Sequence, residues 1–490
     1  MSQLTRRSLL AAAGAAPVLA AQQATPRLNL IHIGVDTWGA HQLGCYGHPE
    51  YRTPNVDALA RRSAMFLEAY PEVLPTIPSR RALYTGRRIF PSDLILQPDD
   101  QVRIRGWHQM YAEDVTLAET LREAGYTTAI VSDVYHQFKP GKNFHRGFES
   151  WRWIRGQESD RLESGPRRGI DLSRYYHPSQ PIPAARSGVV QYLMNRRSWK
   201  TEEDWLAAQA FGEASRWLEN NAGENQPFYL HLESFTPHEY WDPPEAWYRS
   251  YMKKDYRGPW LLAPPGTTEK MSPLEVDHVR ALYAGLVSFT DDRIGKFLRR
   301  VEELGLMKNS LIVFVADHGT MMGEQGQLHK GELRLRTQCT QVPLLVCHPR
   351  ENWAGRRIGG FVQHTDLAPT VLDLLGVRIP DRVTGESLRP LLERGMDSRR
   401  ESIVTGWGEH GAIRTREWLY IGRWSPGKPF EELYDLRRDP LELRNVAEQH
   451  PTEAREFRAR LKEHVAGGWA ITRGTFATNL SPATSGGGGA

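Results

Sequence analysis

Short, continuous runs of apolar residues alternate along this chain with segments in which apolar residues recur every three or four positions. Continuous runs are typical of strands buried on both faces of a sheet, and the longer period is typical of helices with one buried face. The runs predict strands at residues 28–35, 126–131, 228–233, 310–316 and 342–347. The periodic segments predict helices at residues 53–60, 115–125, 205–220 and 279–304. The alternation predicts an α/β fold, with a mixed, mostly parallel sheet sandwiched by helices.

Two of the predicted strands are followed directly by an aspartate. Asp36 comes after the strand at 28–35, and Asp317 comes after the strand at 310–316. In open α/β sheets, ligands bind beyond the carboxyl ends of the strands. The sequence therefore predicts that both carboxylates belong to a functional site at that edge of the sheet.

Two long segments lack a clear period. Residues 136–200 are rich in Arg, Gly, Pro and Ser, and residues 240–272 are rich in Trp, Tyr and Pro. Both resemble insertions into the α/β framework. Such insertions either set substrate choice or are solvated loops without a function, and the sequence leaves these two readings open.

The last part of the chain changes character. Short strands at 402–405 and 418–422 and a helix at 451–465 predict a small α+β subdomain over residues 401–465. The segment 466–490 ends in Ser-Gly-Gly-Gly-Gly-Ala and is predicted to be a disordered tail. Residues 24–400 are then expected to form one large domain, which contains the predicted functional site.

Residues 1–23 have the features of a targeting segment. Arg6 and Arg7 form a twin-arginine pair, an apolar run follows at 9–21, and small residues suitable for cleavage end the run. The run is too short to span a membrane, so no stable membrane insertion is expected. The segment predicts twin-arginine export to the periplasm or the medium of a bacterium.

Composition excludes some classes of function. The 62 basic and 58 acidic residues are mixed along the 490-residue chain and leave a net charge of +4, which does not indicate a nucleic-acid groove. The three cysteines give no disulfide framework, and Cys45 reads as a small buried residue. The oligomeric state is left open.

The segment 75–86 carries the most specific pattern in the chain. Pro78 and Ser79 predict a helix that starts near Arg80 with Ser79 as its N-cap. Thr76 would then precede a helix N-terminus, where unpaired N–H groups and a partial positive charge favour a tetrahedral anion.

This segment resembles the sulfatase signature, which reads Cys or Ser, any residue, Pro-Ser-Arg, three residues, and Leu-Thr-Gly. Tyr84 replaces the Leu, and Thr76 replaces the Cys or Ser that sulfatases oxidise to formylglycine. The resemblance implies an alkaline phosphatase-like fold. It also implies a threonine-nucleophile variant without formylglycine, similar to phosphonate monoester hydrolases and phosphodiesterases.

The same resemblance implies a metal site. Sulfatases and their phosphohydrolase relatives bind metal through blocks that match Asp36 and Asp317-His318, and Thr37 replaces a second Asp that many sulfatases have. Asp36, Thr76, Asp317 and His318 are therefore expected to bind one divalent ion. The few carboxylates favour zinc, manganese or iron, with calcium as the alternative.

Further family blocks imply the other catalytic and substrate-binding residues. His238 matches a histidine that protonates the leaving group, and its usual pKa suits that role. Arg80 and Lys330 are expected to hold the nonbridging oxygens, with His329 as a weaker candidate. Where sulfatases usually have a sulfate-binding Lys, this chain has the stretch 132–136, in which Tyr135 or His136 is left to supply a donor.

The sequence thus predicts an exported, metal-dependent hydrolase that acts on a small anionic ester. Because threonine cannot expel sulfate by collapsing to an aldehyde, a phosphodiester or phosphonate monoester is the first choice. A sulfuric ester is the second choice. A non-catalytic binding protein that kept the pocket after losing the formylglycine residue is the third.

Overall fold

We analysed a computed structural model of the chain, which describes residues 27–92, 104–139, 141–166, 169–182, 188–223 and 226–476. The predicted targeting segment 1–23 and residues 477–490 of the predicted tail lie outside the described residues. Among the described residues, no helix combines the length and apolar character that a bilayer crossing requires.

An eight-stranded sheet forms the centre of the larger part of the molecule, with strand order β10-β2-β9-β6-β1-β5-β3-β4. Only β9 runs antiparallel to its neighbours, so the mixed, mostly parallel sheet predicted from the sequence is confirmed. Its strands are β1 (Asn29–Val35), β2 (Ala64–Tyr70), β3 (Thr127–Ser132), β4 (Ser150–Trp153), β5 (Phe228–Ser234), β6 (Ser310–Ala316), β9 (Val342–Cys347) and β10 (Arg357–Gln363).

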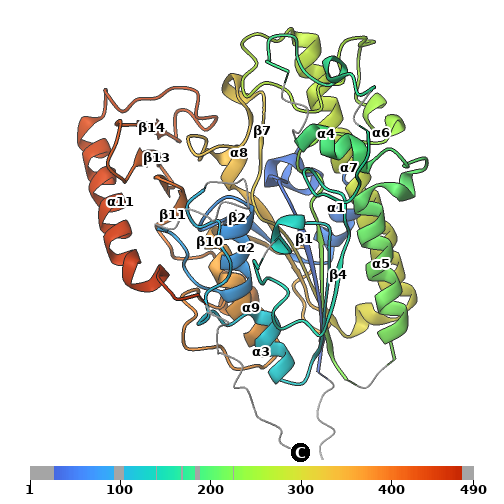
Figure 1. Ribbon diagram of the computed structural model, residues 1–490. Helices are drawn as coiled ribbons and strands as arrows, with labels where there is room; N and C mark the ends of the chain where they lie inside the picture. Colours follow the sequence, from blue (N-terminus) through green and yellow to red (C-terminus); the bar gives the residue numbers. More distant parts are fainter. Residues whose placement is uncertain are drawn as a thin grey trace, which may run out of the picture.

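Helices cover both faces of this sheet (Figure 1). One layer contains α1 (Pro54–Arg61), α5 (Leu206–Asn221) and α7 (Pro273–Glu303), and the other contains α2 (Thr76–Thr85), α3 (Leu117–Glu123) and α9 (Leu367–Leu374). All residues of β1, β5 and β6 are buried, because both faces of these strands are covered. Shorter helices are α4 (Gly188–Asn195), α6 (Glu245–Arg249), α8 (Thr337–Thr340) and α10 (Arg389–Arg394).

Local capping explains where α7 differs from the prediction. The helix begins at Pro273 rather than near residue 279. Ser272 accepts a hydrogen bond from the backbone N–H of Glu275, and the Glu275 side chain accepts one from the Ser272 backbone. Pro273 occupies the first helical position, where its missing N–H costs nothing.

The C-terminal part is a four-stranded antiparallel sheet with a helix packed on it. The strands are β11 (Ser402–Trp407), β12 (His410–Thr415), β13 (Trp418–Arg423) and β14 (Glu431–Asp435), and the helix is α11 (Pro451–Thr472). The sequence predicted only β11, β13 and the start of α11. The helix continues past Val465 because Trp469 packs against Trp424, so the prediction of disorder is wrong for residues 466–472.

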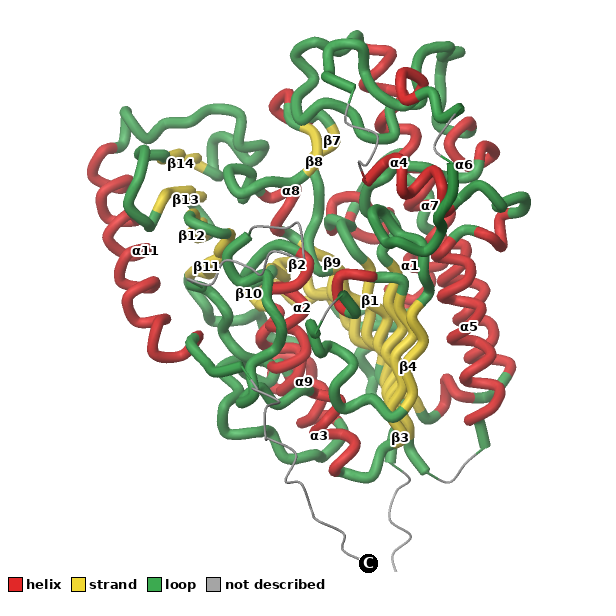
Figure 2. Tube along the Cα trace, in the orientation of Figure 1, coloured by secondary structure: helices red, strands yellow, loops and turns green. Residues whose placement is uncertain are grey.

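The described residues of both predicted insertions include regular elements, with α6 lying in the segment 240–272. Strand β4 extends one edge of the large sheet from within residues 136–200, and α4 lies in the same insertion (Figure 2).

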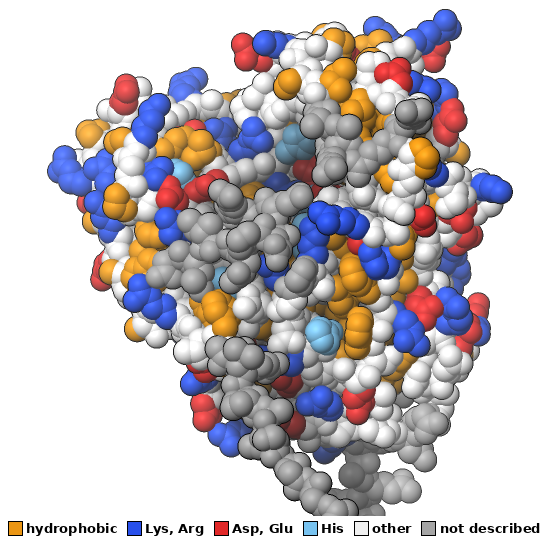
Figure 3. Space-filling model, viewed as in Figure 1, with side chains coloured by type: hydrophobic (Ala, Val, Ile, Leu, Met, Phe, Trp, Pro, Cys, Tyr) orange, Lys and Arg blue, Asp and Glu red, His pale blue; other side chains and the backbone are white. Residues whose placement is uncertain are grey.

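The small hairpin of β7 (Met321–Met322) and β8 (Leu328–His329) lies beyond the end of β6. On the face shown in Figure 3, basic and acidic side chains are interspersed over the described residues.

Candidate active site

Asp36 and Asp317 lie side by side because β1 and β6 are adjacent parallel strands. Val35 pairs with Ala316 at the end of the ladder. One residue further on, the Asp317 N–H donates to the Val35 carbonyl at 3.1 Å, and the Asp36 N–H donates to the Ser234 carbonyl of β5 at 3.0 Å. The backbone hydrogen bonds therefore place both carboxylates at one point of the sheet edge, as the strand pattern predicts.

His318 completes a three-residue group with these aspartates. Its Nε2 is 3.5 Å from Asp317 Oδ2 and 3.9 Å from Asp36 Oδ1, and the ligand atoms of the three residues lie within 4.8 Å of one another. Its Nδ1 donates to the Gly319 carbonyl at 3.0 Å, which leaves the Nε2 lone pair directed at the carboxylates. Burial lowers the pKa of His318 to about 3, so the ring is neutral. Among the residues that the structure describes, its buried Nε2 finds no hydrogen-bond partner.

The carboxylates around Arg80 carry more charge than one guanidinium offsets. Arg80 is fully buried, with Nη2 at 3.0 Å from Asp36 Oδ2 and with Nη1 and Nε bound to Asp317 and Glu233. His231 Nε2 lies 3.4 Å from Glu233, the third carboxylate, so it does not offset the charge of the two aspartates. Burial and the neighbouring Asp317 raise the pKa of Asp36, which shows that a second negative charge is unfavourable there.

A divalent cation fits this arrangement. An unpaired imidazole lone pair and two crowded carboxylates are the ligands and the charge that such an ion requires. Calcium takes six to eight oxygen ligands, whereas a set containing one imidazole suits zinc, manganese or iron. Thr37 supports the set from behind, because its hydroxyl donates to Asp36 Oδ1 and its N–H donates to Asp317 Oδ1.

This arrangement corrects the role predicted for Arg80. The sequence predicts that its guanidinium holds substrate oxygens. In the structure it contacts Asp36, Glu233 and Asp317, donates to the Thr76 carbonyl at 3.1 Å, and has no exposed surface. Arg80 is therefore placed to hold the metal ligands rather than the substrate.

Helix α2 delivers Thr76 to the same site. The helix begins at Thr76 with Pro75 as its N-cap, so the prediction that Ser79 caps a helix starting near Arg80 is wrong. Ser79 lies within the first turn instead, where its hydroxyl donates to the Asp317 carbonyl at 3.0 Å. That contact and the Arg80 contacts fix the N-terminus of α2 against the aspartates. The Thr76 side chain is buried, and within the described residues its hydroxyl makes no hydrogen bond.

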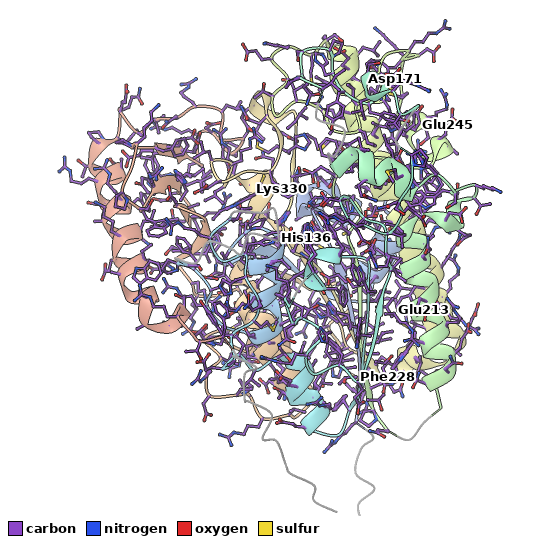
Figure 4. The ribbon with its side chains drawn as sticks, viewed as in Figure 1. His136, Asp171, Glu213, Phe228, Glu245 and Lys330 are labelled. Atoms are coloured by element: carbon purple, nitrogen blue, oxygen red, sulfur yellow. The ribbon has the colours of Figure 1, made fainter. Side chains whose placement is uncertain are left out.

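Lys330, which Figure 4 labels, forms a second group at the site with His238. Lys330 Nζ donates to His238 Nε2 at 2.8 Å and to Glu239 Oε2 at 2.7 Å. Burial acts to lower the pKa of Lys330, but the carboxylates of Glu239, Asp36 and Glu158 together outweigh burial and raise that pKa, so Lys330 is an ammonium. His329 donates from Nδ1 to Glu239 Oε1 at 2.9 Å, and its ring stacks on Trp241. Glu239 thus binds both His329 of β8 and Lys330, which follows that strand.

The sequence predicts that Tyr135 or His136 supplies a donor to the substrate, but in the structure both side chains face the carboxylate of Glu158. The Tyr135 hydroxyl donates to Glu158 Oε2 at 2.8 Å, and His136 Nε2 lies 3.3 Å from the same carboxylate. Asp133 stands near the place of the missing lysine, but it accepts from the Phe235 N–H at 2.6 Å. These three side chains therefore organise the walls of the site.

Sequence reasoning missed Glu233, Glu239 and Glu158. Glu233 lies in β5, beside β1, and the rule that chemistry lies at the carboxyl ends of strands could have found it. Glu239 directly follows the predicted acid His238. Glu158 lies in an insertion without a period and had no signal. Cys45 is half-buried rather than buried as predicted, and burial raises the pKa of its thiol to about 12. Cys339 and Cys347 are also free thiols.

Comparisons with known proteins agree with this architecture. A profile of the Sulfatase family matches residues 28–377, and a profile described as N-sulphoglucosamine sulphohydrolase, C-terminal, matches residues 323–467. The ulvan-active sulfatase of Formosa agariphila is 24% identical over 460 residues, which cover 89% of this chain and 81% of that protein. An arylsulfatase of Clostridium perfringens is 25% identical over 460 residues, covering 85% of this chain and 90% of that protein.

A solved structure shares the fold. The phosphonate monoester hydrolase of Agrobacterium radiobacter superposes with a TM-score of 0.69 at 23% identity, over 91% of this chain and 96% of that one.

Proposed function

The chain belongs to the sulfatase family, and we propose that it hydrolyses phosphodiesters or phosphonate monoesters with the Thr76 hydroxyl as its nucleophile. The observation that carries this proposal is the position of Thr76. It stands at the N-terminus of α2, its carbonyl accepts from the same Arg80 that binds Asp36 and Asp317, and it occupies the signature position that sulfatases convert to formylglycine.

The bound divalent ion would supply Lewis-acid stabilisation of the charge that develops on the hydroxyl and on the transferring group. Asp36, Asp317, His318 and Thr76 would hold it. Thr76 Oγ1 attacks phosphorus and loses its proton to solvent, the bond to the leaving oxygen breaks, and His238, once protonated on Nε2, gives that oxygen a proton. Water then cleaves the bond between Thr76 and phosphorus, which returns the threonine hydroxyl and releases the product acid.

The nucleophile is the reason for preferring phosphorus to sulfur. A formylglycine hydrate releases sulfate by collapsing to the aldehyde, and a threonine ester has no such route. Its second step needs direct attack by water on the central atom, which a phosphoryl or phosphonyl group tolerates better than a sulfuryl group. A phosphonate monoester hydrolase is among the structures with this fold, which supports the choice of a phosphorus ester.

Lys330 is the cation best placed to hold the nonbridging oxygens of a small anionic ester. Its ammonium is close to His238 and is 12% exposed, whereas Arg80 has no exposed surface. Substrate entry would draw the ammonium from His238 Nε2 to the substrate, which frees that nitrogen to bind a proton from solvent and give it to the leaving group.

A comparison of substrates tests the proposal. Purified protein loaded in turn with zinc, manganese, iron or calcium is assayed with matched 4-nitrophenyl esters: a phosphodiester, a phosphonate monoester and a sulfate. We expect kcat/KM for one of the phosphorus esters to exceed that for the sulfate by at least about tenfold, which corresponds to about 1.4 kcal/mol. Faster sulfate turnover would establish the sulfuric ester hydrolase that the names of several relatives suggest. No turnover with any metal would favour a binding protein.

The N-terminal segment supports a proposal about location. Arg6, Arg7 and the apolar run that follows resemble a twin-arginine signal, so we expect the folded protein in the periplasm or the medium. Cell fractionation of the full chain is compared with the Arg6→Lys, Arg7→Lys double variant. The wild-type chain should be exported and shortened, and the variant should stay in the cytoplasm at full length. Equal export of both would remove the twin-arginine assignment.

A further inference from the structure

Glu158 reaches the active site from the insertion at residues 136–200. Its Oε2 accepts from the Tyr135 hydroxyl at 2.8 Å and faces His136 Nε2 at 3.3 Å. Its Oε1 lies 3.7 Å from His238 Nδ1. Two side chains that follow β3 therefore hold the carboxylate, and its second oxygen faces the catalytic histidine.

The backbone around Glu158 is built to keep it there. Its φ of +41° lies in the left-handed region, which costs a glutamate energy and persists only where surrounding contacts enforce it. Gln157 donates to Asp133 Oδ2 at 2.8 Å, and the Gly156 N–H donates to Asp160 Oδ2 at 2.8 Å. Asn195 of α4 donates to the carbonyls of Gly156 and Asp160. These contacts hold the loop on both sides of Glu158.

The charges around His238 show what this carboxylate can do. Lys330 donates to Nε2 at 2.8 Å, and Nδ1 donates to the Glu239 carbonyl at 2.6 Å, so the resting imidazole is neutral. Glu239 Oε2 is 3.2 Å from Nδ1, but the same oxygen pairs with Lys330 at 2.7 Å. Phe235 covers one face of the ring, and the charge of Asp36 also acts on it. Glu158 is the remaining carboxylate in contact with His238 among the described residues.

A leaving group needs a proton on Nε2 of His238. That proton makes the ring a cation beside the Lys330 ammonium, and two neighbouring cations are stable only where carboxylates offset both. Glu239 offsets Lys330. We infer that Glu158 is a positioning residue that stabilises the protonated, leaving-group-directed state of His238. This inference rests on the proposed function, because the proton acceptor is the leaving oxygen of the ester.

The test compares Glu158→Gln with wild-type protein on esters whose leaving groups differ in basicity. Proton donation matters most for a basic leaving group. We expect kcat for an alkyl ester to fall by about 10- to 100-fold and kcat for a 4-nitrophenyl ester to fall less than about threefold. Loss of the carboxylate also disfavours the imidazolium, so the alkaline limb of the pH–kcat profile should move to lower pH by about one unit.

Two further variants separate this role from a structural one. Glu163→Gln removes an exposed carboxylate from the same insertion and should leave both esters and the pH profile unchanged. Tyr135→Phe removes one anchor of Glu158 and should reproduce the leaving-group dependence in weaker form. If Glu158→Gln fails to fold, as a thermal melt would show, Tyr135→Phe carries the test.

Equal losses for all leaving groups, or no loss, would overturn the inference. A readout without substrate keeps it separate from the proposed function. Histidine-ring NMR of the resting protein should show a lower pKa for His238 in Glu158→Gln than in wild type, and an unchanged value would also overturn it. If wild-type protein cleaves no ester, the proposed function fails, while the titration still decides whether Glu158 stabilises the imidazolium.

Discussion

Thr76→Ala is expected to lower kcat for the best phosphorus ester by roughly three orders of magnitude or more, because it removes the atom that attacks. Folding should be preserved, since the Thr76 carbonyl, not its side chain, accepts from Arg80, and alanine suits the first turn of α2. Steady-state kinetics and a thermal melt measure the two effects. A loss below about tenfold would mean that water, not Thr76, attacks the ester.

Two substitutions at the same position sharpen this result. Thr76→Ser keeps a hydroxyl and should retain most of the activity, provided that mass spectrometry shows the serine, like Thr76 in wild type, to be unmodified. Thr76→Cys restores the sulfatase signature. In a host that converts this cysteine to formylglycine, it should raise sulfate turnover relative to phosphodiester turnover. Modified Thr76 in wild-type protein would refute the proposed mechanism.

His318→Ala is expected to reduce affinity for the divalent metal by more than about 100-fold, because substitutions behind the ligands already cost about 10- to 100-fold. Activity should fall in parallel and recover only partly at high metal concentration. Elemental analysis of dialysed protein should give about one metal per chain for wild type and much less for the variant. Isothermal titration with zinc gives the affinities.

His348→Ala is the matched control for this experiment. His348 follows β9 and packs against Trp353, away from the aspartate group, so its loss should leave metal content unchanged. Equal metal content in wild type and His318→Ala would exclude His318 as a ligand. If calcium is the only metal found in the wild-type protein, the imidazole of His318 does not determine which metal binds.

Long apolar strands were predicted well from the sequence because their signal is local, whereas the predicted starts of α2 and α7 were wrong. Strand β6 has the predicted bounds, since its run of apolar residues is buried on both faces. Strands β12 and β14 were missed, because they contain charged or glycine residues and are stabilised by antiparallel neighbours. The end of α11 was also missed, since the contact between Trp469 and Trp424 joins residues far apart in the chain.

The same distinction applies to the site. Asp36, Asp317 and His318 were predictable because each follows a recognisable strand and the strands are neighbours. The sequence does not show which partner a long polar side chain selects. Arg80 is bound by carboxylates of three different strand ends, and Tyr135 is bound by a glutamate in a segment without periodicity.

The two halves of the active site differ in how readily evolution can alter them. Asp36, Glu233 and Asp317 belong to neighbouring strands of the buried sheet, joined by one arginine, so a change in any of them disturbs the others and the core. Glu158, by contrast, is carried by a surface insertion, and Glu239 by the loop after β5. A change in the length of those loops can alter which leaving group the site accepts, while the aspartates and Glu233 around Arg80 stay in place. Proteins with this scaffold can therefore differ in substrate specificity while they keep the same reaction mechanism.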